Sequence, residues 1–120
     1  MPVRCVIVDD NSLFLEGSAD LLRREGLDVV GVASNSAQAI RLVSELRPDV
    51  TLVDIDLGDE DGFDLAQRLH AIFGDTKVIL VSTHAEADLA HLIERSPALG
   101  FIAKTRLSAQ AIRDTLERAA

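Results

Sequence analysis

The sequence predicts an α/β protein in which a five-stranded parallel sheet carries helices on both faces. Short apolar stretches rich in β-branched residues recur along the chain at a steady interval, as expected for buried strands. They cover residues 3–8, 29–32, 50–53, 78–81 and 101–103. The segments between them carry apolar residues at helical spacing. Because only a parallel sheet that is covered on both sides buries every strand, this alternation indicates an α/β sandwich.

The expected helices have one apolar face each and recognisable ends. The apolar face of the second helix, for example, consists of Ala37, Ile40, Val43 and Leu46. Asn11 and Asn35 can cap the N-termini of the first and second helices, and Ser108 can cap that of the last. Gly26 and Gly74 stand where helices should end. The capping residues therefore agree with the apolar periodicity.

Composition and charge exclude several classes of function. The 120 residues, 48% of them apolar, suffice for one core, so we expect a single domain over residues 1–120 without an output domain. The 20 acidic and 12 basic residues give a net charge of -8, which argues against direct binding of nucleic acid. The apolar runs are too short to cross a membrane, and the single Cys5 cannot form an internal disulfide. We expect a soluble, cytoplasmic protein.

Polar residues gather at the ends of the expected strands. They are Asp9 and Asp10 after the first strand, Asp54 at the end of the third, Ser82 and Thr83 after the fourth, and Lys104 after the fifth. Open parallel sheets bind ligands beyond the carboxyl ends of their strands, so these side chains should converge there. Two like charges ~4 Å apart repel by about 4 kcal/mol at an effective dielectric constant near 20. A divalent cation such as Mg²⁺, together with Lys104, would offset that repulsion.

This set of residues predicts phosphoryl-transfer chemistry. A carboxylate beside a divalent cation can act as a nucleophile toward phosphorus and form an aspartyl phosphate. Asp54 is the candidate, because it stands at a strand end opposite the acidic pair Asp9 and Asp10. The hydroxyl of Ser82 could bind an oxygen of the transferred group.

Five pieces of sequence together resemble the receiver domains of bacterial two-component response regulators, and the resemblance spans essentially the whole chain. They are the pair Asp9-Asp10, the stretch Val53-Asp54-Ile55-Asp56-Leu57, the following Asp61-Gly62, Ser82 after an apolar strand, and Gly100-Phe101 with Lys104. The resemblance implies a CheY-like, flavodoxin-like (βα)5 fold with strand order 2-1-3-4-5.

The resemblance also implies a role for each acidic residue of the site. Asp54 would be phosphorylated. Asp10 and Asp54 would ligate Mg²⁺ (or Mn²⁺) together with the main-chain carbonyl of Asp56. Asp9 would contribute through a bound water. The domain would not be an enzyme, apart from catalysing its own phosphotransfer and autodephosphorylation.

For the switch, the resemblance implies that Ser82 moves toward the phosphoryl group and that Lys104 pairs with it. Phe101 would change rotamer, and the output surface would lie on the fourth helix, fifth strand and fifth helix. The phosphoryl donor would be a sensor histidine kinase or a histidine phosphotransfer protein. A downstream effector protein, or an output domain missing from this chain, would receive the signal, with phosphorylation-dependent homodimers as a further option.

Three residues depart from the usual receiver pattern. Gly58 replaces a common proline, so we expect a more mobile loop after Asp54. Thr83 replaces a small residue and should narrow the entrance to the site. Thr105 replaces the proline that usually follows the lysine, so we expect no cis peptide bond between Lys104 and Thr105, because that bond would cost about 3 kcal/mol without proline.

Other polar residues receive simpler interpretations. Asp56 and His84 occupy positions that tend to set the lifetime of the phosphoryl group, and we hypothesise that their side chains tune autodephosphorylation. No histidine has a companion at metal-ligand spacing, so His70, His84 and His91 should be exposed. Residues 59–61 should form a solvated acidic turn, followed by Gly62 with a positive φ.

Two other functions fit parts of the pattern. The Asp54-Ile55-Asp56 segment also matches the start of haloacid-dehalogenase-like phosphatases, although their nucleophile follows the first strand. Flavodoxins share the expected architecture and bind FMN at the same edge of the sheet. The acidic residues after the first strand would repel the FMN phosphate, and the chain has no Trp or Tyr to stack on a flavin.

Overall fold

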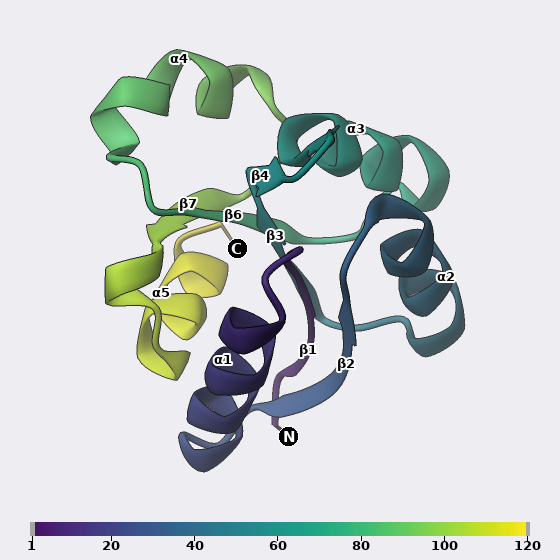
Figure 1. Ribbon diagram of the computed structural model, residues 1–120, viewed down its shortest axis with the longest axis vertical. Helices are drawn as coiled ribbons and strands as arrows, with labels where there is room; N and C mark the ends of the chain where they lie inside the picture. The colour runs from purple at the N-terminus through teal and green to yellow at the C-terminus, as the bar shows by residue number, and fades with distance from the viewer. Residues whose placement is uncertain (1, 120) are drawn as a thin grey trace.

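The computed structural model describes residues 2–119, and over these residues the chain forms the predicted parallel sheet (Figure 1). Its strands are β1 (Arg4–Val8), β2 (Asp28–Ala33), β3 (Val50–Asp54), β6 (Val78–Ser82) and β7 (Gly100–Ala103). They lie in the order β2-β1-β3-β6-β7, with every neighbouring pair parallel. This is the expected order 2-1-3-4-5, and each strand begins and ends within one residue of its predicted bounds.

The helices cover both faces of the sheet. They are α1 (Ser12–Arg24), α2 (Ser36–Leu46), α3 (Gly62–Phe73), α4 (Glu86–Arg95) and α5 (Ala109–Ala119). Helices α1 and α5 lie on one face, and α2, α3 and α4 lie on the other (Figure 1). None of these helices in residues 2–119 is long and apolar enough to cross a membrane.

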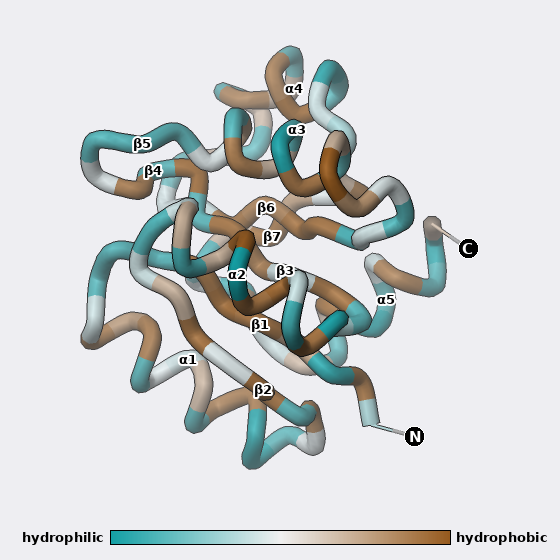
Figure 2. Tube along the Cα trace, turned by 90° about the vertical axis from the view of Figure 1, so that its right-hand side faces the viewer, coloured by the Kyte–Doolittle hydropathy of each residue, from teal (hydrophilic) through white to brown (hydrophobic). Residues whose placement is uncertain are grey.

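Each strand contributes to two separate cores because successive side chains point to opposite faces of the sheet. In β1, Cys5 and Ile7 pack with α1 and α5, whereas Val6 and Val8 pack with α2 and α3. Figure 2 shows the result: the strands form an apolar centre, and the helices carry polar residues outward. Burial of the Cys5 thiol raises its pKa to about 12, so this cysteine is an apolar core residue.

The predicted helix ends are confirmed. The side chain of Asn11 accepts hydrogen bonds from the N–H groups of Leu13 and Phe14, and Asn35 accepts one from Gln38. The hydroxyl of Ser108 accepts from the Ala111 N–H at 3.0 Å. Gly74 ends α3 with φ +68°, in the left-handed region that glycine tolerates.

The prediction of a solvated acidic turn after Asp54 was only partly right, because residues 59–61 are exposed but also make specific contacts. Strand β4 (Asp56–Leu57) pairs with β5 (Glu60–Asp61) in a small hairpin, so residues 59–61 are not simply a solvated turn. The Glu60 carboxylate accepts a hydrogen bond of 2.8 Å from the N–H of Ser36, at the start of α2. The Asp61 side chain caps α3 by accepting from Phe63 at 2.9 Å. The contact of Glu60 joins residues that are 24 positions apart, so no local pattern in the sequence indicates it.

Gly62 also differs from its prediction. It begins α3 and does not have a positive φ. A glycine is needed for a different reason: a Cβ at this position would collide with the carbonyl oxygen of Asp54 and lie 2.7 Å from the Cα of Ile55. The start of α3 therefore packs directly on the backbone at the end of β3.

Candidate functional site

The polar residues predicted from the strand ends meet at one edge of the sheet. Asp9 and Asp10 follow β1, Asp54 is the last residue of β3, and Lys104 follows β7 in a short 3-10 helix (Lys104–Arg106). Strands β1 and β3 are neighbours, which places the three aspartates side by side.

One carboxylate oxygen of each of Asp9, Asp10 and Asp54 lies within 4.8 Å of the other two. Asp9 is fully buried and Asp54 is 5% exposed, whereas Asp10 lies at the surface and opens the group to solvent. One oxygen of the buried Asp9 also lacks a directed hydrogen bond. Closely spaced carboxylate oxygens of this kind suit a hard divalent cation.

Lys104 supplies the one cation that contacts the buried carboxylates among the residues described. Its Nζ lies 2.7 Å from Oδ2 of Asp9 and 3.0 Å from Oδ2 of Asp54. The contact with Asp9 is a close ion pair, and that with Asp54 is also a well-directed hydrogen bond. Burial acts to lower the pKa of Lys104, but its bonds to the two carboxylates outweigh burial and raise that pKa. Lys104 is therefore charged.

The pKa of Asp54 is raised toward neutral pH by its surroundings. Burial, followed by the charge of Asp9, raises the pKa of Asp54 from 3.8 to about 6, against the hydrogen bonds from Lys104 and from the Asp56 N–H. Because the raised value still lies below 7, the carboxylate form of Asp54 predominates at neutral pH.

Backbone groups hold the buried carboxylates in place. Oδ1 of Asp9 accepts from the Asn11 N–H at 2.9 Å, and Oδ1 of Asp54 accepts from the Asp56 N–H at 3.1 Å. Gly58, with φ +70°, lies against Asp10, and a Cβ there would be 3.1 Å from Oδ2 of Asp10. The loop after β3 thus packs on the surface aspartate as well as on the buried one.

Ser82 lies at the end of a neighbouring strand, and its hydroxyl binds the backbone of His84. It is fully buried at the end of β6, and its hydroxyl oxygen accepts a 3.0 Å hydrogen bond from the His84 N–H. Thr83 is exposed. All three histidines are exposed, as predicted. The side chains of His84 and Asp56 meet at the rim, with Nε2 3.2 Å from Oδ2 of Asp56, a contact that the sequence did not reveal.

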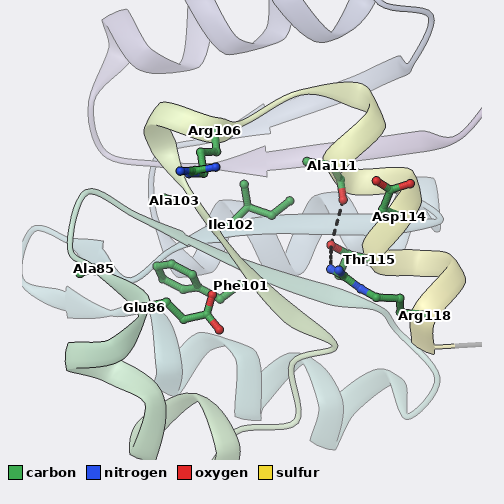
Figure 3. Close-up of a pocket in the computed structure, with 10 residues that line it drawn as sticks. All are labelled: Ala85, Glu86, Phe101, Ile102, Ala103, Arg106, Ala111, Asp114, Thr115 and Arg118. Carbon is green, nitrogen blue, oxygen red and sulfur yellow. Dashed lines mark hydrogen bonds between the residues drawn. The ribbon is translucent and has the colours of Figure 1, made fainter.

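Phe101 lies apart from the acidic group. It is half-buried on β7 and lines a pocket of about 430 Å³ between α5 and the start of α4. Figure 3 shows its ring beside Glu86, with Thr115 and Arg118 of α5 on the far side.

The peptide bond between Lys104 and Thr105 is trans, as expected.

One neighbour of Lys104 was missed in the sequence. The ring of Phe14, in the first turn of α1, has its centre 4.2 Å from Nζ of Lys104. Phe14 stands five residues after Asp9, within the helix that the acidic pair precedes, and this proximity was the available signal.

Known proteins resemble the chain over almost its full length. Residues 5–117 match the family described as response regulator receiver domain. The transcriptional regulatory protein LiaR of Bacillus subtilis is 28% identical over 98% of this chain and 56% of its own length. The solved receiver domain of the putative response regulator NarL from Mycobacterium tuberculosis is 31% identical, with a TM-score of 0.84 over 98% of this chain and 96% of that one.

A second solved structure shares the fold at lower identity. The CheX-CheY-BeF3-Mg complex from Borrelia burgdorferi contains a chain that is 19% identical, with a TM-score of 0.82 over 98% of this chain and 89% of that one. The present chain spans about half the length of the curated relatives that it matches. The receiver match covers residues 5–117, which include the segments that also resembled a haloacid-dehalogenase-like phosphatase and a flavodoxin. It therefore argues against both of these alternative functions.

The strand order, the acidic group with Lys104 and the family match agree with one another. The chain therefore belongs to the response regulator receiver domain family, and it is a phosphorylation-dependent signalling switch, not an enzyme apart from its own phosphotransfer.

Proposed function

We propose that Asp54 accepts the phosphoryl group, from a phosphohistidine of a sensor histidine kinase or a histidine phosphotransfer protein. The observation that carries this assignment is the position of Asp54: 5% exposed, 3.0 Å from the Lys104 ammonium, and grouped with two further carboxylates. A carboxylate oxygen of Asp54 attacks phosphorus, the P–N bond to the donor imidazole breaks, and the electron pair leaves with the imidazole nitrogen.

Magnesium, or manganese in its place, fits the carboxylate group. Asp10 and Asp54 would hold it with the main-chain carbonyl of Asp56, and Asp9 would act through a bound water. The ion would supply positive charge to the phosphoryl oxygens. Lys104, which already contacts Asp54, would add a second positive charge.

Phosphorylation would then shift the domain between two arrangements. It adds about -1.5 to -2 charges and three acceptor oxygens to Asp54. The hydroxyl of Ser82 would bind one of these oxygens, and its hydrogen bond from the His84 N–H would have to adapt. Phe101 would change rotamer in step with Ser82. The two residues lie on neighbouring strands, where Leu80 pairs with Phe101 and Ser82 pairs with Ala103. The changed surface would be α4, β7 and α5, where Phe101 lines its pocket.

The partners follow from this role. The output would pass to a downstream effector or to an output domain outside this chain, or act through a homodimer that forms on phosphorylation. Two-component donors act in the cytoplasm, and we propose the same compartment for this domain. Neither nucleic acid nor a membrane would be its direct partner.

Three residues at the edge of the acidic site, Asp56, His84 and Thr83, would tune the rate of autodephosphorylation.

Intact mass after incubation with acetyl phosphate and Mg²⁺ tests the assignment of Asp54. The wild type should gain one phosphoryl group, and the gain should disappear with a chelator and in Asp54→Asn. Asp59→Asn is the matched control, because Asp59 is an exposed acid of the neighbouring loop. Phosphorylation of Asp54→Asn, or its loss in Asp59→Asn, would contradict the assignment.

A further inference from the structure

Lys104 has a third neighbour that is not a carboxylate. Two of its contacts are Asp9 at 2.7 Å and Asp54 at 3.0 Å, and the third is the face of Phe14, with 4.2 Å between Nζ and the ring centre. A cation at this distance from an aromatic face is attracted by the ring quadrupole, more strongly where water is excluded.

The Lys104 ammonium and the apolar space under Phe14 are both largely shielded from water. The Lys104 side chain is only 15% exposed. The gap that Phe14 lines together with Asp9, Asp54 and Leu107 is too small to admit a water molecule. A smaller side chain at position 14 would therefore leave one side of the ammonium without a partner, or admit water to the site.

The backbone fixes Phe14 relative to the acidic group. Asn11 donates its N–H to Oδ1 of Asp9 and accepts the Phe14 N–H through its side chain, at 2.9 and 3.2 Å. The same residue thus connects the buried carboxylate to the backbone of Phe14. These two bonds fix the position from which the ring extends.

An aromatic face differs from a third hydrogen-bond acceptor in one useful respect. It attracts the positive charge but does not demand a particular N–H direction. The ammonium can therefore turn its donors from Asp54 toward a phosphoryl oxygen on Asp54 while it keeps the ring contact. A third carboxylate or carbonyl would have to be released in the same movement.

We propose that Phe14 is a positioning residue for phosphotransfer, which holds the Lys104 ammonium over the acidic group through its aromatic face. The inference rests on the proposed function, in which Lys104 contacts the transferred group. The competing interpretation is that Phe14 only packs, because it also lies against the apolar cluster under α1 and α5.

Fluorinated phenylalanines at position 14 separate the two interpretations, since added fluorine weakens the quadrupole of the ring and nearly preserves its shape. The rate of phosphorylation by acetyl phosphate with Mg²⁺ should fall stepwise with the number of fluorines. The total loss at the pentafluoro ring, and in Phe14→Leu, should be about tenfold. Phe14→Tyr should retain the wild-type rate. A flat fluorine series would overturn the inference.

A double-mutant comparison tests whether the effect passes through Lys104. In a Lys104→Met background, Phe14→Leu should cause no further loss of rate, whereas a packing role would slow both backgrounds equally. Phe73→Leu is the matched control, because Arg47 lies 5.4 Å from that ring, far from the acidic group. Wild-type protein that takes up no phosphoryl group would refute the proposed function itself. A normal wild-type rate with equal losses in both backgrounds would refute only the role of Phe14.

Discussion

Helices α3 and α4 cover the same face of the sheet but are attached to it very differently. Helix α3 buries Gly62, Leu65, Ala66 and Leu69, and its N-terminus is capped by a side chain. Helix α4 has no buried residue among those described, no side-chain cap, and Leu92 48% exposed. Local stability follows buried apolar contact, so α4 should separate from the sheet at a lower free-energy cost than α3.

This difference separates the functions of the two regions. Helix α3 begins on the backbone of Asp54, so its firm packing holds Asp54, the proposed phosphoacceptor, in place. Helix α4 borders the Phe101 pocket, where a change of rotamer needs room (Figure 3). The chemistry thus lies on the rigid part of the fold, and the proposed output surface lies on the loosely packed part.

The largest expected effect tests the packing difference directly. Leu65→Ala should lower the free energy of unfolding by about 2–5 kcal/mol, because Leu65 is fully buried. Leu92→Ala should change it by less than about 0.5 kcal/mol. Urea unfolding of the two variants measures both values. Equal losses would show that α4 is packed as firmly as α3.

The junction between α3 and β3 gives the next effect. Gly62→Ala should cost about 1–3 kcal/mol of unfolding free energy, because the new Cβ meets the Asp54 carbonyl. Gly17→Ala, on the exposed face of α1 with no atom within 4 Å of the new Cβ, should instead stabilise the protein by about 0.5–1 kcal/mol. A neutral Gly62→Ala would mean that the start of α3 can shift freely.

The pH dependence of the unfolding free energy tests the raised pKa of Asp54, which lies in the rigid region. With the pKa of Asp54 raised from 3.8 to about 6, the folded protein holds this proton more tightly than the unfolded chain does. The stabilisation is complete below pH 3.8 and is lost as pH rises through about 6. In metal-free buffer, the wild type should lose on the order of 1 kcal/mol over this window relative to Asp54→Asn. Parallel pH curves for the two proteins would contradict the raised pKa.

A small effect on stability is expected for the exposed pair of His84 and Asp56, which lies between the two regions. Removing the pair of His84 and Asp56 by His84→Ala should change unfolding free energy by less than about 0.5 kcal/mol, because both side chains are mostly exposed. The lifetime of the phosphorylated state is the informative measurement. We expect both His84→Ala and Asp56→Ala to change the decay rate, and unchanged rates in both would refute the tuning role.

Sequence and structure agree where the signal is local or periodic. The strands, the caps Asn11 and Asn35, and the convergence of Asp9, Asp54 and Lys104 all follow from apolar periodicity and from the rule that binding sites lie at strand ends. The failures at Glu60 and Gly62 have another origin. Their partners are the N-terminus of α2 and the carbonyl of Asp54, which are distant in sequence or set by the exact approach of a helix.

The sequence alone determined the fold class, the order of elements and the group of residues that carries the chemistry, because those depend on alternating apolar periods and on side chains at strand ends. Only the tertiary structure decided that Phe14 faces Lys104, that His84 meets Asp56 and that α4 is loosely attached. Such contacts depend on how far each helix approaches the sheet, and no local pattern encodes that distance.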